Sequence, residues 1–170
     1  MTWFEQFARA NFEALVPTAS LTVLQVGVWT GDATEWLLTN RDVASITDVD
    51  CWDGTPMEGV DYAEAERVYD SRFSNVREVT KVKAFSDDFF ASNADTFNFI
   101  YVDGDHDPDQ TCRDGVNAWQ ALAPGGVLAF DDYEWQLHGV SPKAGIDAAL
   151  TQMPDHEVLL KGYQVWIGKP

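Results

Sequence analysis

The chain has 170 residues, a length that fits one domain, so we expect a single domain over residues 1–170. Its 28 acidic and 11 basic side chains give a formal net charge of −17, which disfavours nucleic acid and anionic membrane surfaces as partners. The acidity suits a protein kept soluble or adapted to high salt, and it leaves open an acidic mouth that attracts cations.

Cysteine usage and hydropathy indicate where the protein resides. Cys51 and Cys112 lie far apart without metal-type spacing, so we expect free thiols in a reducing compartment. No basic patch followed by an apolar run suggests a signal peptide, and no apolar stretch approaches the ~18 residues of a spanning helix. These features predict a cytoplasmic protein; homo-oligomerisation stays open.

Residues 2–16 have the spacing of a helix. Trp3 and Phe7 repeat at helical spacing, as do Phe4 and Phe12, and Pro17 lies just past the end. Such an aromatic stripe usually packs on the domain. The alternative is that residues 1–17 form a partial lid over a substrate pocket.

Apolar runs typical of buried strands then alternate with helical patterns. We expect strands at 21–26, 43–49, 79–85, 97–102 and 127–130. Helices are expected after Asp32, whose spacing to Glu35 suggests a capping box, and at 61–73, 87–92, 108–122 and 141–153. Loops are expected at 54–60 and at the turn 124–126.

This alternation predicts a doubly wound α/β fold, with a mostly parallel sheet and helices on both faces. Segments 157–160 and 163–167 flank Lys161-Gly162 and predict a C-terminal antiparallel hairpin. In such folds ligands bind outside the carboxyl ends of the strands, where the strand order reverses.

The first predicted strand runs into a glycine loop, GVWTG, bordered by Gly27 and Gly31. Glycine permits close approach of backbone to a ligand, and the following helix N-terminus offers free N–H groups. Asp50 lies 19 residues after Gly31, near the ~20-residue offset at which an acid reaches ribose hydroxyls. We therefore predict an adenosine-containing ligand. The loop is one glycine short of the dinucleotide fingerprint, which counts against NAD. The alternative is a tight turn with a solvated Asp50.

Acidic residues follow the fourth and fifth predicted strands. If these strands are neighbours, Asp103, Asp131 and Asp132 converge, and their mutual repulsion favours a hard cation such as Mg²⁺. The cation would acidify a substrate hydroxyl, and His106 or Asp105 would take its proton as general base. The alternative is structural: an aspartate caps the next helix and the Asp131-Asp132 pair shapes a loop.

The loop after this pair also carries aromatic side chains that suit a planar or sugar-like acceptor, or that merely pin the loop: Tyr133, Trp135 and His138.

Four stretches taken together, VLQVGVWTG, VDCWDG, FIYVDGDH and LAPGGVLAFDDY, resemble the class I S-adenosylmethionine-dependent methyltransferases. Within that class they resemble the small branch of macrocin-type O-methyltransferases and, more distantly, cephalosporin hydroxylase-like proteins. The resemblance covers roughly residues 21–167. It implies a Rossmann-like seven-stranded sheet and S-adenosylmethionine as cofactor.

The resemblance also implies roles for individual residues. Gly27 and Gly31 would border the methionine part of the cofactor, Asp50 would bind the ribose, and Phe85 with Ser86 would lie at the adenine. The full expected cofactor-binding set is Gly27, Val28, Trp29, Gly31, Asp50, Cys51, Phe85, Ser86 and Asp103. Metal-dependent relatives, including catechol O-methyltransferase-like enzymes, carry acids where this chain has Asp103, Asp131 and Asp132.

Two departures bear on function. Gln25 stands where the class commonly has an acid in the first strand, and the long N-terminal lid of many macrocin-type enzymes is missing. The expected activity is Mg²⁺-assisted methyl transfer to a hydroxyl of a small molecule. The alternatives are a metal-independent methyltransferase acting on nitrogen or carboxylate, a non-catalytic cofactor-binding module, and an iron-dependent hydroxylase-like activity.

Overall fold

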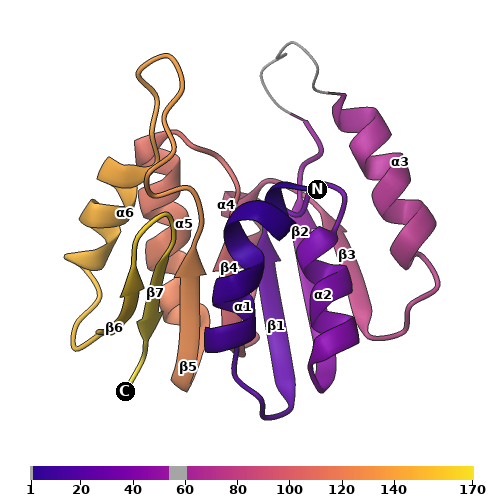
Figure 1. Ribbon diagram of the computed structural model, residues 1–170, viewed down its shortest axis with the longest axis horizontal. Coiled ribbons are helices and arrows are strands. Elements are labelled where there is room, and N and C mark those ends of the chain that lie inside the picture. Colours follow the sequence, from indigo (N-terminus) through magenta and orange to yellow (C-terminus); the bar gives the residue numbers. More distant parts are fainter. Residues whose placement is uncertain (1, 54–60) are drawn as a thin grey trace.

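A computed structural model describes residues 2–53 and 61–170 of the chain. Its centre is one seven-stranded sheet with the order β3-β2-β1-β4-β5-β7-β6 (Figure 1). Strands β1 to β5 are mutually parallel, and β7 and β6 form an antiparallel hairpin at one edge. The strands are β1 (Leu21–Val26), β2 (Val43–Asp50), β3 (Val79–Lys83), β4 (Phe97–Val102), β5 (Leu122–Phe130), β6 (Glu157–Lys161) and β7 (Val165–Gly168). The predicted fold class is confirmed.

Helices cover both faces of the sheet (Figure 1). One apolar cluster packs α5 and α6 against one face, and a second packs α1 and α2 against the other. A smaller cluster seats α3 beside Val28 and Trp52. The helices are a π-helical turn η1 (Phe4–Ala8), α1 (Arg9–Leu15), α2 (Asp32–Asn40), α3 (Tyr62–Phe73), α4 (Ser86–Ser92), α5 (Pro108–Ala121) and α6 (Lys143–Leu150).

Period-two alternation divides the central strands between the two clusters. In β4, Phe99 and Tyr101 face α1, whereas Ile100 and Val102 face α5 and α6. Burial of each such side chain contributes roughly 1.5–3 kcal/mol, which explains why these strands are apolar on both faces.

Aspartates begin two of the helices as the sequence suggests. Asp61 caps α3 by accepting the Glu64 N–H, and Asp107 caps α5 ahead of Pro108. The capping box expected at Asp32 and Glu35 is wrong. The N-cap is Gly31 in the left-handed region, and both carboxylates instead pair with Arg72 of α3, at 2.7 Å and 2.6 Å.

Other boundaries also differ from the sequence expectation. The N-terminal helix opens as the π-helical turn, and residues 124–126 lie within β5, where the register with β4 shifts. The hairpin loop comprises residues 162–164, so Tyr163 and Gln164 lie outside the strand ladder. The loop expected over 54–60 lies outside the described residues. No helix in the described part of the chain is long and apolar enough to cross a membrane.

The strand order fixes where a ligand would bind. The chain proceeds from β1 to β2 and β3 on one side, and β4 and β5 extend the sheet on the other. The order therefore reverses between β1 and β4, at the carboxyl edge that lies uppermost in Figure 1. The N-terminal end of the chain lies at the same edge.

Candidate functional site

The glycine loop after β1 rests directly on the end of β4. Gly27 has φ +79°, and a Cβ atom there would lie 2.0 Å from the main-chain oxygen of Asp103. Only glycine fits this position, because both the backbone angle and the space exclude a side chain. The two strand ends at the reversal point are thereby held in contact.

Left-handed backbone recurs at the next two alternate positions of this loop. Trp29 has φ +53° and Gly31 has φ +82°. A Cβ on Gly31 would lie 2.3 Å from the Phe73 ring, so this glycine is needed for the packing of α3. Trp29 leaves 44% of its surface exposed, and its ring meets that of Tyr62 edge-on at 5.8 Å.

Asp50, at the end of β2, binds backbone in the loops that follow both β1 and β2. One carboxylate oxygen accepts the N–H groups of Val28 (2.7 Å) and Trp29 (2.9 Å), and the other accepts that of Trp52 (2.7 Å). Trp52 in turn donates its indole N–H to the Trp29 carbonyl. This carboxylate therefore shapes the loop in which we expect the cofactor. Its role at the ribose stays a prediction.

The other predicted cofactor residues flank this loop. Cys51, beside Asp50, donates its thiol to the Asp53 carbonyl, and burial raises the pKa of that thiol. Phe85 is the N-cap residue of α4 and has 61% of its surface exposed. Ser86 accepts the side-chain amide of Gln110, which also donates to the buried Asp114. The predicted adenine side is thus built jointly by α4 and α5.

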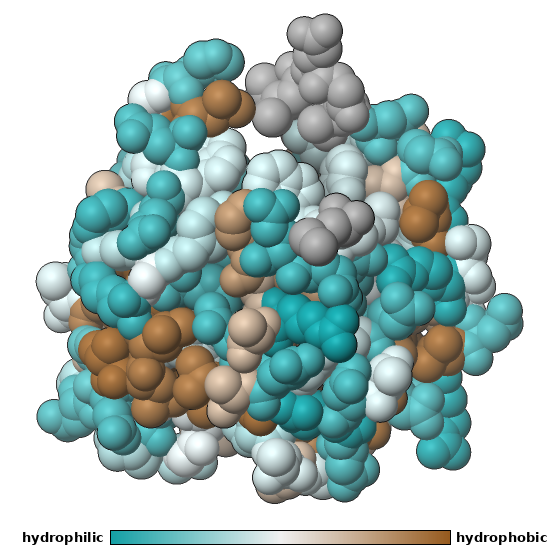
Figure 2. Space-filling model, viewed as in Figure 1, coloured by the Kyte–Doolittle hydropathy of each residue, from teal (hydrophilic) through white to brown (hydrophobic). Residues whose placement is uncertain are grey.

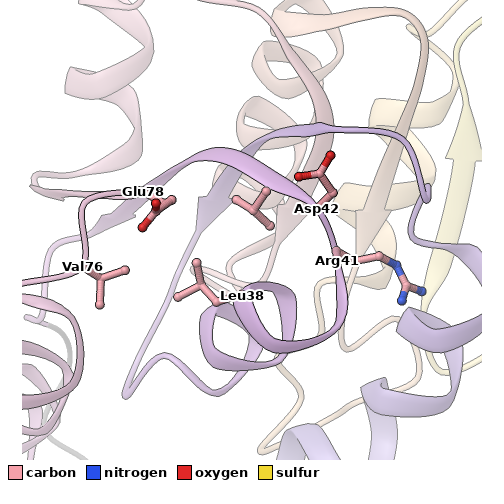
Figure 3. Close-up of a pocket in the computed structure, with 6 residues that line it drawn as sticks. Leu38, Arg41, Asp42, Val76 and Glu78 are labelled. Carbon is pink, nitrogen blue, oxygen red and sulfur yellow. The ribbon is translucent and has the colours of Figure 1, made fainter.

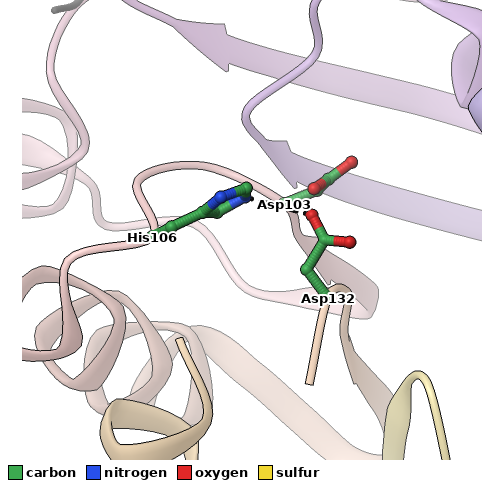
Figure 4. Close-up of side chains that lie close together, drawn as sticks. All are labelled: Asp103, His106 and Asp132. Atoms are coloured by element: carbon green, nitrogen blue, oxygen red, sulfur yellow. Dashed lines mark ion pairs between the residues drawn. The ribbon is translucent and has the colours of Figure 1, made fainter. Parts of the chain in front are cut away.

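Asp103, His106 and Asp132 converge at the carboxyl ends of β4 and β5 (Figure 4). One potential ligand atom from each lies within 4.8 Å of the others, and His106 Nε2 is 3.1 Å from Asp132 Oδ2. Two carboxylates and an imidazole are a donor set suited to a divalent cation. In the described part of the chain, this is the one such cluster.

Asp131 lies beside this cluster but is turned away from it. Its carboxylate accepts the Tyr101 hydroxyl, the Asp132 N–H at 2.8 Å and the Gln164 amide at 3.1 Å. The structure therefore brings together two of the three predicted metal ligands, Asp103 and Asp132, and adds His106.

The electrostatics of the cluster favour a bound cation. Burial, reinforced by the charges of Asp131 and Asp132, raises the pKa of Asp103 well above its usual range. Burial and the neighbouring Asp132 likewise raise the pKa of Asp131. A divalent ion would offset the repulsion between Asp103 and Asp132.

The two predicted general bases occupy different places. His106 belongs to the cluster, and its ring packs on Trp135 at 4.3 Å. Asp105 is exposed, and its carboxylate accepts the Asp107 N–H at 2.9 Å, which shapes the turn into α5. On this geometry His106 is the better placed of the two to meet a substrate.

Two residues that hold Asp132 and the adjacent Asp131 were missed by the sequence reasoning. The Tyr163 hydroxyl donates to Asp132 at 2.5 Å, and the Gln164 amide donates to Asp131. The sequence suggests only a hairpin strand here, so nothing in its pattern reveals these contacts. Burial and the hydrogen bond to Asp132 raise the pKa of the Tyr163 hydroxyl, which keeps it a donor.

A shallow groove at the opposite edge of the sheet is not a competing site (Figure 3). It lies at the amino ends of β2 and β3, lined by Asp42 and Glu78 among others. Its one guanidinium, on Arg41, is committed to main-chain carbonyls at the end of α1: those of Phe12, Glu13 and Val16.

Comparison with known proteins shows which family the chain belongs to. The sequence profile of a methyltransferase-domain family matches residues 24–133, more than half of the chain. The chain therefore belongs to this methyltransferase family. None of the curated protein sequences compared with it matches significantly.

Solved structures share the fold at low sequence identity. A proposed rRNA methylase from Clostridium thermocellum superposes with a TM-score of 0.71 at 15% identity, covering 100% of this chain and 98% of that one. The N-methyltransferase NodS from Bradyrhizobium japonicum, solved with S-adenosyl-L-homocysteine, gives 0.66 at 18%, covering 98% and 85%. The O-methyltransferase NovP gives 0.67 at 17%, covering 98% and 77%. These similarities establish the fold alone.

Proposed function

We propose that this protein transfers a methyl group from S-adenosylmethionine to a hydroxyl of a small molecule, assisted by Mg²⁺ held at Asp103 and Asp132. The observation that carries the proposal is the convergence of Asp103, His106 and Asp132 beside the glycine loop. Membership of a methyltransferase family supports the reaction class. The resemblance of the sequence motifs to macrocin-type O-methyltransferases supports a hydroxyl acceptor.

The proposed cofactor site is the loop of residues 27–31 with Asp50. Fold relatives bind S-adenosyl-L-homocysteine, the demethylated product of this cofactor. When bound, the cofactor supplies an electrophilic methyl group on its sulfonium. The chain supplies orientation: Gly27 brings the loop against Asp103, so donor and acceptor sites adjoin.

The acceptor site is proposed at the cation cluster. A divalent ion bound there would supply Lewis acidity toward an acceptor hydroxyl. Asp103 and Asp132 would hold the ion, and His106 would either complete its ligand set or take the hydroxyl proton at Nε2. His106 Nε2 lies 3.1 Å from Asp132 Oδ2, so the ring nitrogen that either role would use faces the cluster.

Calorimetric titration with S-adenosylhomocysteine, with and without Mg²⁺, tests this proposal. We expect micromolar binding of the ligand and a separate Mg²⁺ event that disappears in Asp132→Asn. Asp105→Asn is the matched control, because this exposed carboxylate lies outside the cluster, and it should retain both events. Ligand binding without any Mg²⁺ event would instead favour a metal-independent methyltransferase or a binding module. Absence of ligand binding would overturn the methyltransferase proposal itself.

A further inference from the structure

Tyr163 is placed by the hairpin loop to hold Asp132 in one orientation. The loop releases Tyr163 from the β6–β7 ladder, and its hydroxyl donates to Asp132 Oδ1 at 2.5 Å. The other oxygen, Oδ2, is the one that lies 3.1 Å from His106. The Tyr163 hydroxyl thus holds one oxygen of Asp132, while the other oxygen faces the cluster.

The backbone of Asp132 makes such support necessary. Asp132 has φ +58°, a left-handed conformation that a non-glycine residue keeps only when its surroundings hold it there. Its N–H donates to Asp131 Oδ1, and the next N–H, of Tyr133, donates to the Tyr163 carbonyl at 2.8 Å. The hairpin loop therefore holds both the backbone and the side chain at this position.

The N-terminal segment packs against Tyr163 through Phe7 of η1. The ring of Phe7 stacks on that of Tyr163, with centroids 4.7 Å apart and an interplanar angle of 21°. Trp3 stacks on Phe7 at 5.3 Å, so three rings form a continuous stack outward from Asp132. Trp3 leaves 72% of its surface exposed at the outer end.

A second contact from the N-terminal segment, made by Asn11 of α1, orients Gln164 toward Asp131. Gln164 is fully buried; its oxygen accepts the Asn11 amide at 2.8 Å and the Trp166 indole N–H at 2.9 Å. Its amide nitrogen is thereby directed to Asp131. Thus Tyr163 holds Asp132 toward the cluster, and the next residue, Gln164, holds Asp131 away from it.

We propose that Tyr163, seated by Phe7, is the positioning residue for Asp132, so that the N-terminal segment forms part of the cation site. This inference rests on the proposed function of that site. Partners that orient a ligand from outside the coordination shell typically contribute 10–100-fold to metal affinity. The segment read from the sequence as a packing helix or partial lid would then have a third role.

Direct measurement of cation affinity tests the inference without any acceptor. Mn²⁺ accepts similar ligands and is counted by electron paramagnetic resonance, with Mg²⁺ as competitor. Tyr163→Phe, which removes one oxygen and keeps the stack, should weaken binding by about 10-fold. Phe7→Leu, which removes the stacked ring and keeps the hydroxyl, should weaken it in the same direction.

Two controls separate positioning from general damage. Tyr133→Phe removes a hydroxyl one residue from Asp132, but that hydroxyl bonds to Asp147 on α6, so it should leave Mn²⁺ affinity unchanged. Affinity for S-adenosylhomocysteine and the melting temperature should be unaltered in Tyr163→Phe.

Each outcome decides the matter. Wild-type Mn²⁺ affinity in Tyr163→Phe would overturn the inference and leave the proposed function standing. Parallel loss of S-adenosylhomocysteine affinity and melting temperature would show a merely structural role and also overturn it. No Mn²⁺ or Mg²⁺ binding by the unaltered protein would overturn the proposed cation site, and the inference with it.

Discussion

Gly27 shows how one residue couples the fold to the site. Its left-handed backbone turns the chain out of β1, and its missing side chain lets Asp103 lie against the turn. Gly125 has a similar φ of +74°, but a Cβ there would meet no atom within 4 Å. A substitution at Gly125 therefore incurs backbone strain alone, whereas one at Gly27 incurs both backbone strain and steric overlap.

We predict that Gly27→Ala destabilises the protein far more than Gly125→Ala. The left-handed backbone alone costs an L-residue roughly 1–2 kcal/mol, and at Gly27 the overlap with Asp103 must add to this by forcing β1 and β4 apart. Chemical denaturation measures both variants, and S-adenosylhomocysteine titration should show weakened binding for Gly27→Ala alone. Equal destabilisation of the two variants would show that contact between the strand ends is unimportant.

For single residues, the sequence predicts which acidic side chains gather at the site but not which way each side chain points. The spacing of Asp103, Asp131 and Asp132 predicts that all three gather at one edge, and they do. Which of the adjacent aspartates faces the cluster depends on Tyr101 of the neighbouring strand β4 and on Tyr163 and Gln164 of the hairpin loop, all far away in sequence. Such long-range contacts leave no local pattern to read.

Elements around β1 and β2 are joined through one buried carboxylate. Asp48, fully buried in β2, accepts the Gln25 amide of β1 at 2.7 Å and the Thr34 hydroxyl of α2 at 2.8 Å. The Tyr69 hydroxyl of α3 donates to it at 2.7 Å. Gln25, noted in the sequence as a departure from the class, is thus committed to this network.

The strands were readable from sequence because parallel strands buried on both faces are continuous apolar runs. The run of β1 matches residues 21–26. The start of α2 was misread because Asp32 and Glu35 have capping-box spacing, yet a salt bridge to Arg72, 37 residues beyond Glu35, determines their orientation. Tertiary charge pairing here outweighs the local motif.

The Asp48 network predicts a specific dependence of stability on pH. Burial raises the pKa of Asp48 from its ordinary 3.8 to about 6, and hydrogen bonds from its three partners oppose this only partly. Between about pH 4 and pH 6 the folded state thus binds more protons than the unfolded state. Stability contributed by Asp48 is therefore present below this window and lost as pH rises through it, by about 3 kcal/mol.

Asp48→Asn removes this titration, because an amide does not ionise and the Gln25 amide can rotate to pair with it. Unfolding by urea at pH 4 and pH 7 should show the variant gaining about 2 kcal/mol relative to wild type across that range, because part of the Asp48 window lies below pH 4. Asp95→Asn, at an exposed position, is the control and should show no such gain. Parallel pH profiles for Asp48→Asn and wild type would contradict the prediction.

Across the whole molecule, the basic side chains are committed away from the candidate site. Nine of the eleven form ion pairs with carboxylates: Arg9, Arg67, Arg72, Arg77, Lys81, Lys83, Arg113, Lys143 and Lys161. Arg41 and Lys169 bind main-chain carbonyls. Within the described ranges, no lysine or arginine pairs with Asp50, Asp103 or Asp132.

The visible surface agrees with this distribution. Figure 2 shows a mostly hydrophilic face whose largest hydrophobic area lies at lower left, over the β6–β7 hairpin. Val158 and Leu159 of the edge strand β6 are its exposed apolar residues. Neither this area nor the acidic carboxyl edge offers the basic stripe that tracks a phosphate backbone.

We therefore predict that the protein does not bind RNA, although one fold relative is a proposed rRNA methylase. Proteins that bind nucleic acid without specificity do so with dissociation constants of roughly 10⁻⁴–10⁻⁶ M, through lysine and arginine contacts to phosphates. Here those side chains are paired, and the net charge of −17 repels the polyanion. Fluorescence anisotropy with labelled single-stranded and hairpin RNA at low salt should show no saturable binding up to about 100 µM protein. S-adenosylhomocysteine titration on the same sample checks that the fold is intact. Binding that weakens steeply with added salt would mean that some of these ion pairs open to receive phosphates, and it would return an RNA acceptor to consideration.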